Sequence, residues 1–347
     1  MMGFLWFWLV AVMIVGYVVF DGFDLGVGVL HLFLVRNETE RQATLRSIGP
    51  VWDGNEVWLI AGGGTLYFAF PLLYASAFSG FYLPLMIVLW LRGLRGISIE
   101  LRNHSEVCVW RALLDGVFGL ASTLLGIFYG AALANVLRGV PLKADGYFFL
   151  PLWTNWQPGI SPGILDWYTV IGGLVALVAL TLHGALWLTI KVSGQLERRA
   201  RNLVTPLWLV LIALTAVSLV ATVAVRPESL HNYNTYPISY IVPLGVVVSL
   251  FLLWYWNRKA QPVKAFLASS VYLFFMLAGA CWSVYPSLLP ATTGTQNDIT
   301  LTRALSGQHT LSVGLAWWTF GMILAVCYMV FVYSRFKGKV DVAESGH

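Results

Sequence analysis

The sequence predicts an all-α, polytopic membrane protein with nine transmembrane helices. Three observations lead to this class. Hydrophobic residues make up 58% of the 347 residues and charged residues only 11%, less than half of the roughly 25% that is usual for soluble domains. Nine apolar runs are long enough to cross roughly 30 Å of hydrocarbon as helices. The basic residues collect in alternate loops between these runs, as they do in membrane proteins with a defined orientation.

The apolar runs set the expected elements. We expect residues 1–347 to form a single integral-membrane domain. Its spans are expected at about 5–34, 57–74, 77–97, 113–137, 164–190, 204–225, 238–256, 265–286 and 309–333. The first basic residue is Arg36, so the first run lacks the basic segment of a signal peptide. We therefore expect it to remain as a helix in the mature protein.

The loops predict the orientation. Of the 21 Lys and Arg residues, 17 follow the odd-numbered spans, and such residues are enriched in cytoplasmic loops. The N-terminus is therefore expected in the periplasm and the C-terminus in the cytoplasm. Arg95 and Arg102 belong to this set, and with Glu100 they form an expected interfacial charge cluster. Because the basic residues do not gather on one solvated face, nucleic-acid binding is excluded.

Two carboxylates stand inside the first span. Asp21 and Asp24 are three residues apart, so they share one helix face. A charged side chain at the bilayer centre costs about 2.5–3.5 kcal/mol on insertion scales. The nearby Gly22, Gly26 and Gly28 permit close approach of a neighbouring helix. We therefore expect this face to look into protein or water and not into lipid.

A second acidic pair precedes the second span. Asp53 and Glu56 are also three residues apart. One interpretation is a capping box, with Asp53 as the N-cap and Glu56 at the third helical position. The other is a proton entry point at the cytoplasmic edge, from which protons pass towards Asp21 and Asp24. The spacing is compatible with both.

The other ionisable residues favour structural roles. Arg111 and Asp115 have the spacing of an i,i+4 ion pair, and Asp166 is expected to cap the fifth span. His183 is interpreted as a hydrogen-bonded packing residue and not as a metal ligand. No P-loop, GxSxG or HExxH motif is present, so we predict no catalytic residue and no metal site in this chain.

Several segments together resemble subunit II of the cytochrome bd-type quinol oxidases, including the cyanide-insensitive branch. They are the runs Asp21 to Gly28, Arg36 to Arg41, Ser47 to Leu59, Ala75 to Tyr82 and Tyr285 to Pro290. The similarity extends over the whole chain, and its most specific part lies in residues 20–82, where Trp52 to Asn55 read WDGN.

The resemblance implies a terminal respiratory oxidase of the bacterial inner membrane, which oxidises membrane quinol and reduces oxygen to water. The two b-type haems and haem d would belong to the larger subunit I, and this chain would hold no tightly bound cofactor except a structural quinone that some members carry. Its implied roles are to support subunit I and to line a cytoplasmic proton-uptake path that includes Asp53. Small single-span subunits are further implied partners. We expect the helices to pack as two four-helix bundles plus one peripheral helix.

A second interpretation is an ion-coupled secondary transporter that uses Asp21, Asp24 and Asp53. Transporters also place carboxylates and interrupted helices within the membrane. A matched pair of broken helices in the two halves of the chain would favour it, and the sequence contains no such pair.

Overall fold

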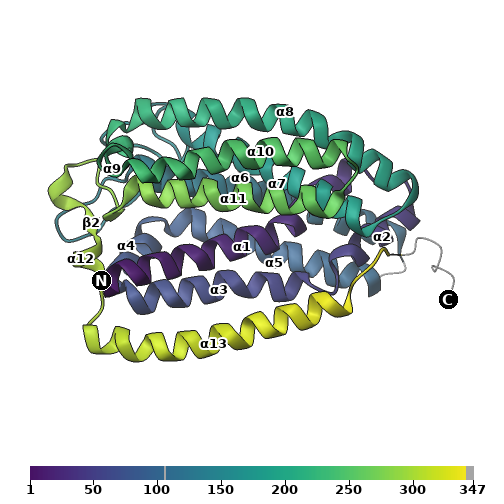
Figure 1. Cartoon of the computed structure of the whole chain (residues 1–347), viewed down its shortest axis with the longest axis horizontal. Coiled ribbons are helices and arrows are strands. Elements are labelled where there is room, and N and C mark those ends of the chain that lie inside the picture. The colour runs from purple at the N-terminus through teal and green to yellow at the C-terminus, as the bar shows by residue number, and fades with distance from the viewer. Residues whose placement is uncertain (105–106, 341–347) are drawn as a thin grey trace.

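The computed structural model describes residues 1–104 and 107–340, and its elements are almost all helices (Figure 1). The long helices are α1 (Met2–Phe33), α3 (Trp52–Ala69), α5 (Tyr82–His104), α6 (Cys108–Arg138), α7 (Trp167–Lys191), α8 (Gly194–Val225), α10 (Ile241–Arg258), α11 (Pro262–Val284) and α13 (Gln308–Arg335). The short elements are α2 (Glu38–Ile48), α4 (Pro71–Gly80), η1 (Pro227–Leu230), α9 (His231–Thr235), η2 (Pro237–Tyr240), β1 (Ser287–Leu289), η3 (Thr295–Asn297), β2 (Ile299–Thr300) and α12 (Leu301–Ala304).

Eight helices in the described part of the chain are long and apolar enough to cross a membrane. They are α1, α5, α6, α7, α8, α11, α13 and a segment that includes α10. The exception among the long helices is α3, which has 18 residues and includes Asp53, Asn55 and Glu56 in its first two turns. At 1.5 Å per residue, α3 is still about 27 Å long, and it runs beside α1 in the bundle (Figure 1).

The stretch predicted as the second span, 57–74, is divided between two helices. α3 begins five residues earlier, at Trp52, and ends at Ala69, while α4 begins at Pro71. A proline has no N–H for the helical ladder, but it suits the first position of a new helix. The chain therefore breaks at Phe70 instead of continuing to residue 74.

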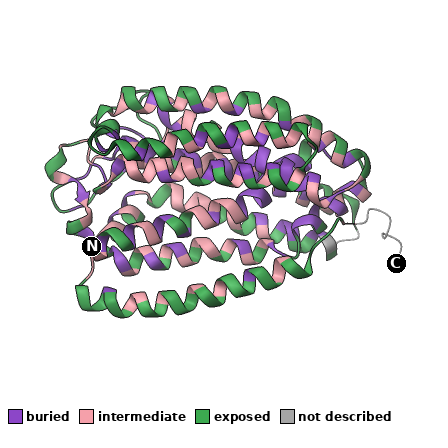
Figure 2. Cartoon of the chain, in the orientation of Figure 1, coloured by how far each residue is buried: buried purple, intermediate pink, exposed green. Residues whose placement is uncertain are grey.

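Helix packing centres on α1, α6 and α7. α7 packs against α6 and α8 and also against α1, while α10 pairs with α11. In the most apolar stretch of α7, 56% of the residues are buried inside the protein, whereas in that of α13 only 6% are. α13 accordingly lies at the edge of the molecule and is mostly exposed (Figure 2). An exposed apolar helix of this kind is stable when lipid or a partner covers it.

The two ends of the bundle differ. One end carries α2, and the other carries the N-terminus and the β-strands (Figure 1). There, β1 pairs antiparallel with β2, so that Ser287 faces Thr300. At the same end, Asp166 caps α7 through a capping box with Thr169, as the sequence predicted.

Candidate functional site

Close helix contact positions the acidic face of α1. A Cβ atom built on Gly26 would lie 1.9 Å from the backbone oxygen of Leu180, and one on Gly184 would lie 2.4 Å from the backbone carbon of Gly26. Only glycine therefore permits α1 and α7 to touch at this point. With α1 held in this way, the side chains of Asp21 and Asp24 are both 0% exposed. The carboxylates face protein, as the sequence analysis predicted.

Arg95 of α5 joins the two acidic pairs. Its Nη2 donates to Oδ1 of Asp21 at 2.7 Å, and its Nη1 donates to Oδ2 of Asp21 and to Oε1 of Glu56, both at 3.1 Å. The Arg95 side chain is completely buried. A buried guanidinium is stable only when carboxylates pair with it. Arg95 therefore lies at the centre of the network and not, as the sequence analysis expected, in an interfacial charge cluster.

Arg92, one turn before Arg95 on α5, extends this network. Its Nη2 lies 3.1 Å from Oε2 of Glu56, and its Nη1 donates to the hydroxyl of Tyr17 at 3.3 Å. The Tyr17 hydroxyl in turn donates to that of Tyr129 on α6 at 2.9 Å. Glu56 is thus held by two arginines, and its side chain is 17% exposed. We call Asp21, Asp24, Glu56, Arg92 and Arg95 the Arg95 network.

Asp24 has a different environment from Asp21. Its Oδ2 accepts a hydrogen bond from Nδ2 of Asn55 at 2.7 Å. Oδ1 of Asn55 then accepts from the hydroxyl of Tyr333 on α13 at 2.9 Å. Oδ1 of Asp24 is buried and has no hydrogen-bond partner among the described residues. A buried polar atom without a partner needs an explanation, and this oxygen can accept a proton or a water molecule without breaking an existing bond.

Asp53 lies apart from the other three acids. It is exposed, in the first turn of α3. The N-cap of α3 is Val51, and no side chain makes a capping hydrogen bond there. Of the two interpretations of Asp53 and Glu56, the capping box is therefore wrong, because the helix begins one residue before Asp53. A carboxylate in the first turn still interacts favourably with the positive end of the helix dipole.

The sequence analysis missed the roles of Arg92 and Arg95. A signal was present, because these arginines are three residues apart, as are the two acidic pairs. Three helices that each present a pair of charges at this spacing can meet along one line. Of the four acids named in advance, Asp21 and Glu56 therefore pair with Arg95. Asp24 lies one turn from Asp21 and binds Asn55, and Asp53 lies at the exposed edge.

A second group of charges, centred on the buried Asp115, lies near α2. Asp115 is 2.7 Å from Nε2 of His31, 3.2 Å from Nη1 of Arg41 and 2.5 Å from Nε of Arg102. Arg102 also pairs with Glu38 of α2 at 3.0 Å. We call these five residues the Asp115 cluster. The predicted partner of Asp115, Arg111, lies 3.7 Å from Glu38.

His183 makes hydrogen bonds through both ring nitrogens. Nδ1 of His183 is 2.6 Å from Oγ of Ser269, and Nε2 is 3.1 Å from the backbone oxygen of Val19. Both ring nitrogens are engaged, which confirms the predicted packing role and does not fit an axial haem ligand. In the described chain, no group of three or more His, Cys, Asp or Glu residues could hold a metal ion.

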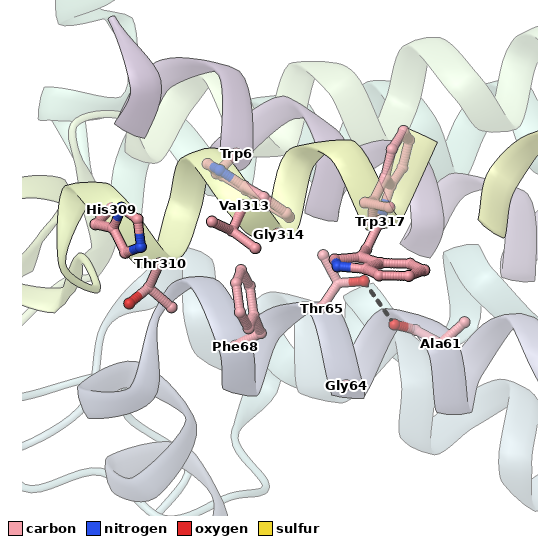
Figure 3. A pocket seen from close by; sticks show the side chains of 11 residues that line it. Trp6, Ala61, Gly64, Thr65, Phe68, His309, Thr310, Val313, Gly314 and Trp317 are labelled. Atoms are coloured by element: carbon pink, nitrogen blue, oxygen red, sulfur yellow. Dashed lines mark hydrogen bonds between the residues drawn. The ribbon is translucent and has the colours of Figure 1, made fainter. Parts of the chain in front are cut away.

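A cavity of about 540 Å³ lies between α3 and α13. Figure 3 shows Phe68 and Thr65 of α3 facing α13 across this space, with Trp6 of α1 nearby. Its α3 residues, from Ala61 to Phe68, lie beyond Glu56 towards the far end of that helix. The cavity is apolar and separate from the Arg95 network.

Eight apolar helices around a buried ion network define a polytopic membrane protein with carboxylates held inside the protein. The comparisons with known proteins identify the family. The model of the cytochrome bd terminal oxidase subunit II family matches residues 2–336. The chain belongs to this family. It is thus a subunit of a quinol oxidase, which is a haem-dependent oxidoreductase complex with a subunit I partner, and a multi-pass protein of the bacterial inner membrane.

Individual relatives agree with this assignment. The chain is 31% identical to cytochrome bd-I ubiquinol oxidase subunit 2 of Escherichia coli strain K12, over 99% of this chain and 97% of that protein. It is 30% identical to cytochrome bd ubiquinol oxidase subunit 2 of Bacillus subtilis, over 89% and 88%. A chain of the bd oxidase structure from Geobacillus thermodenitrificans has the same fold, with a TM-score of 0.76, 16% identity and coverage of 96% and 98%. The transporter alternative gains no support.

Proposed function

We propose that this chain supports the haem-bearing subunit I and lines a cytoplasmic proton-uptake path through Asp53, Glu56, Asp21 and Asp24. One observation carries this proposal. Acids of α1 and α3 that are far apart in sequence meet around the buried Arg95, and the exposed Asp53 lies one turn from Glu56 on α3. Charged groups inside a membrane protein are costly and commonly mark ion or proton routes.

Within this path the four acids have different tasks. Asp53 exchanges protons with water because it is exposed. Glu56 is partly exposed and follows Asp53 by one turn, about 4.5 Å along the helix. Asp21 accepts two hydrogen bonds from Arg95 and holds that arginine in place. Asp24 has an unpartnered oxygen and is the acceptor inside the protein.

The partners and cofactors of this function lie mainly outside the chain. The two b-type haems and haem d are placed in subunit I, and membrane quinol and oxygen are substrates of the complex. Small single-span subunits are further partners. This chain binds no cofactor tightly, apart from a structural quinone that the family resemblance allows. To test this, the chain is expressed without subunit I, and it should show no Soret band above background. A stoichiometric haem in the isolated chain would contradict the assignment of the haems to subunit I.

The relay role of Asp53 is tested by two substitutions in the complete oxidase. Asp53 makes no capping hydrogen bond, so neither Asp53→Asn nor Asp53→Glu should disturb the start of α3. Asn cannot ionise, and quinol-driven oxygen uptake per haem should fall by about tenfold or more. Glu keeps a carboxylate and should retain most of the activity.

The matched control is Asp145→Asn. Asp145 lies in the loop after α6 and accepts a hydrogen bond from the backbone N–H of Tyr147. Oxygen uptake should not change in this variant. Full activity at full haem content in Asp53→Asn and Asp24→Asn together would remove proton transfer from the function of this chain and leave it as a supporting subunit.

A further inference from the structure

A second cavity, of about 320 Å³, lies at the end of the bundle opposite α2. Its walls come from the ends of α6 and α8, from η1 and from two loops. The residues that matter here are Arg138, Ile160, Arg226, Glu228 and Asp298. This volume is at the lower end of the range for small-molecule sites. The cavity shares no residue with the Arg95 network or with the apolar cavity.

The two arginines of this cavity differ in whether a carboxylate already pairs with them. Arg138 donates to Asn135 and Asp166, so it is already neutralised. Arg226 is half-buried, and its Nη1 donates to the backbone oxygen of Leu137 at 3.2 Å. Within the described residues, Arg226 forms no ion pair, although carboxylates line the same cavity. One guanidinium is therefore left with donors for an external anion.

Burial explains why binding of an anion would stabilise the Arg226 guanidinium. Burial lowers the pKa of Arg226, and the nearby charges of Asp298 and Glu228 only partly oppose this effect. A half-buried cation is stabilised by a directly bound anion. Phosphate is a suitable anion because a guanidinium can bind it through two parallel hydrogen bonds.

The carboxylates on the other side favour a cation. Glu228 is exposed, and its carboxylate has no hydrogen bond or ion pair to the described residues. Asp298 is 9% exposed and accepts from Oγ of Ser287 at 2.6 Å and from the backbone N–H of Ala291 at 2.8 Å. Its position is thus fixed, while its charge still faces the cavity. A zwitterion with an anionic and a cationic group would match both sides.

α8 has an exposed apolar face in its last turns, close to the end at which the cavity lies. Val217, Val220 and Val223 are 49%, 72% and 37% exposed, and their spacing of three places them on one face of the helix. α8 ends at Val225, which lines the cavity, and Arg226 follows directly. In Figure 1, α8 and α13 lie at opposite edges of the bundle. A ligand with apolar chains can therefore lie on α8 with its polar head in the cavity.

We propose that this cavity binds the headgroup of a phosphatidylethanolamine molecule. The phosphate accepts hydrogen bonds from Arg226, the primary ammonium faces Glu228 and Asp298, and the acyl chains lie along α8. The ammonium distinguishes this lipid from phosphatidylglycerol, which has no cation. Its N–H donors distinguish it from phosphatidylcholine, whose quaternary ammonium cannot donate a hydrogen bond.

The test measures lipid retention by the purified oxidase complex, and not oxygen uptake. The complex is delipidated, exposed to equal amounts of phosphatidylethanolamine and phosphatidylcholine, and examined by native mass spectrometry. The wild type should retain one phosphatidylethanolamine in preference to phosphatidylcholine. Arg226→Gln should reduce this retention by about tenfold, since hydrogen bonds to charged groups contribute about 1.5–3 kcal/mol. Glu228→Gln should keep a phospholipid but lose most of the headgroup preference.

The matched control is Arg335→Gln, which removes a guanidinium near the C-terminal end of α13 and should leave retention unchanged. Glycerophosphoethanolamine, which has the headgroup without acyl chains, should not displace the lipid at equal concentration. Displacement by this compound would instead show a site for a soluble zwitterion. Equal retention in the wild type and Arg226→Gln, or equal binding of the two lipids by the wild type, would overturn the proposal.

Discussion

The Arg95 network and the Asp115 cluster are both centred on buried charges, yet their balance differs. The Arg95 network has three carboxylates and two arginines, and one oxygen of Asp24 has no partner in the described chain. The Asp115 cluster has two carboxylates, two arginines and His31. There, Oδ1 of Asp115 accepts from His31 and Arg102, and Oδ2 accepts from Arg41 and Arg102. A network with more carboxylates than arginines and with a carboxylate oxygen that has no partner is suited to proton exchange. A cluster whose central carboxylate oxygens all accept hydrogen bonds is suited to holding helices together.

The positions of the two groups agree with this difference. The Asp115 cluster connects α1, α2, α5 and α6, so it fixes the short helix α2 to the bundle. The Arg95 network connects α1, α3 and α5 and reaches α13 through Asn55 and Tyr333. Burial of charge thus does not by itself indicate function. The informative feature is whether the carboxylate oxygens are occupied, since Nδ1 of His31 in the Asp115 cluster also has no partner among the described residues.

The largest expected effect is on topology, because its readout is all or none. If both charge groups lie near the cytoplasm, reporter fusions after Arg46, Arg102, Arg199 and Lys259 should report the cytoplasm. Fusions after Lys143, Glu228 and Asp298 should report the periplasm. Paired alkaline phosphatase and green fluorescent protein fusions give this measurement. Two or more reversed sites would contradict both the nine-span arrangement and uptake from the cytoplasm.

The next effect is on assembly. Arg95→Met would leave Asp21 and Glu56 without their shared cation inside the protein, and breaking a buried ion pair costs about 3–5 kcal/mol. The yield of haem-containing complex should fall severely. As a control, Arg258→Met removes an arginine whose side chain, among the described residues, only stacks on Trp254 near a helix end, and its yield should remain high. A normal yield of Arg95→Met would show that the network is not needed for folding.

A matched pair of substitutions tests whether the Arg95 network acts in proton transfer and the Asp115 cluster in assembly. Asp24→Asn keeps an acceptor for Asn55 but cannot ionise, so oxygen uptake per haem should fall by about tenfold or more at normal haem content. Asp115→Asn removes the charge that holds Arg41 and Arg102, so the amount of complex should fall more than the activity per haem. Haem spectra and oxygen electrode rates measure both quantities. The opposite pattern would exchange the roles assigned to the two groups.

The smallest expected effect concerns pH and the attachment of α2. Burial raises the pKa of Glu40, but hydrogen bonds from Arg199 and from the backbone N–H of Arg36 lower it more, so the net pKa lies below its usual 4.5. This contribution to stability is complete above about pH 4.5 and is lost as the pH falls through the folded-state value. The change should be below about 1 kcal/mol.

Hydrogen exchange of α2 at pH 6 and pH 3.5 measures this effect, after correction for the intrinsic pH dependence of exchange. Glu40→Gln removes the titration, so its α2 should show less additional opening at the lower pH than the wild type. The pH-dependent opening should be confined to α2, since the ion pairs of Asp115 still hold its neighbours. An identical response in wild type and Glu40→Gln would show that Glu40 does not titrate in this range.

Local sequence patterns predicted much of this molecule. Apolar runs of sufficient length predicted the long helices, because hydrocarbon allows only backbone that is hydrogen-bonded within its own segment. The three-residue spacing of Asp21 and Asp24 correctly predicted an acidic face turned into protein. The predicted cap of Asp166 was confirmed for a similar reason, because capping depends on residues close in the chain. The predicted second span, 57–74, was wrong because the helix ends before Pro71. Proline is a known helix boundary, so the local sequence contained this signal.

Only the tertiary structure decided which charges meet. Arg95 is 74 residues from Asp21 and 39 from Glu56. Its three-residue spacing from Arg92 was a local signal, but that spacing does not show which acids it meets, whereas Arg102 joins the Asp115 cluster instead. The choice depends on how α5 is rotated and shifted against α1 and α3, and this rotation results from the packing of many apolar side chains at once. The sequence alone determined that the chain is a membrane protein with internal acids, because length and hydropathy are properties of single segments. Their pairing with particular arginines depends on packing between segments.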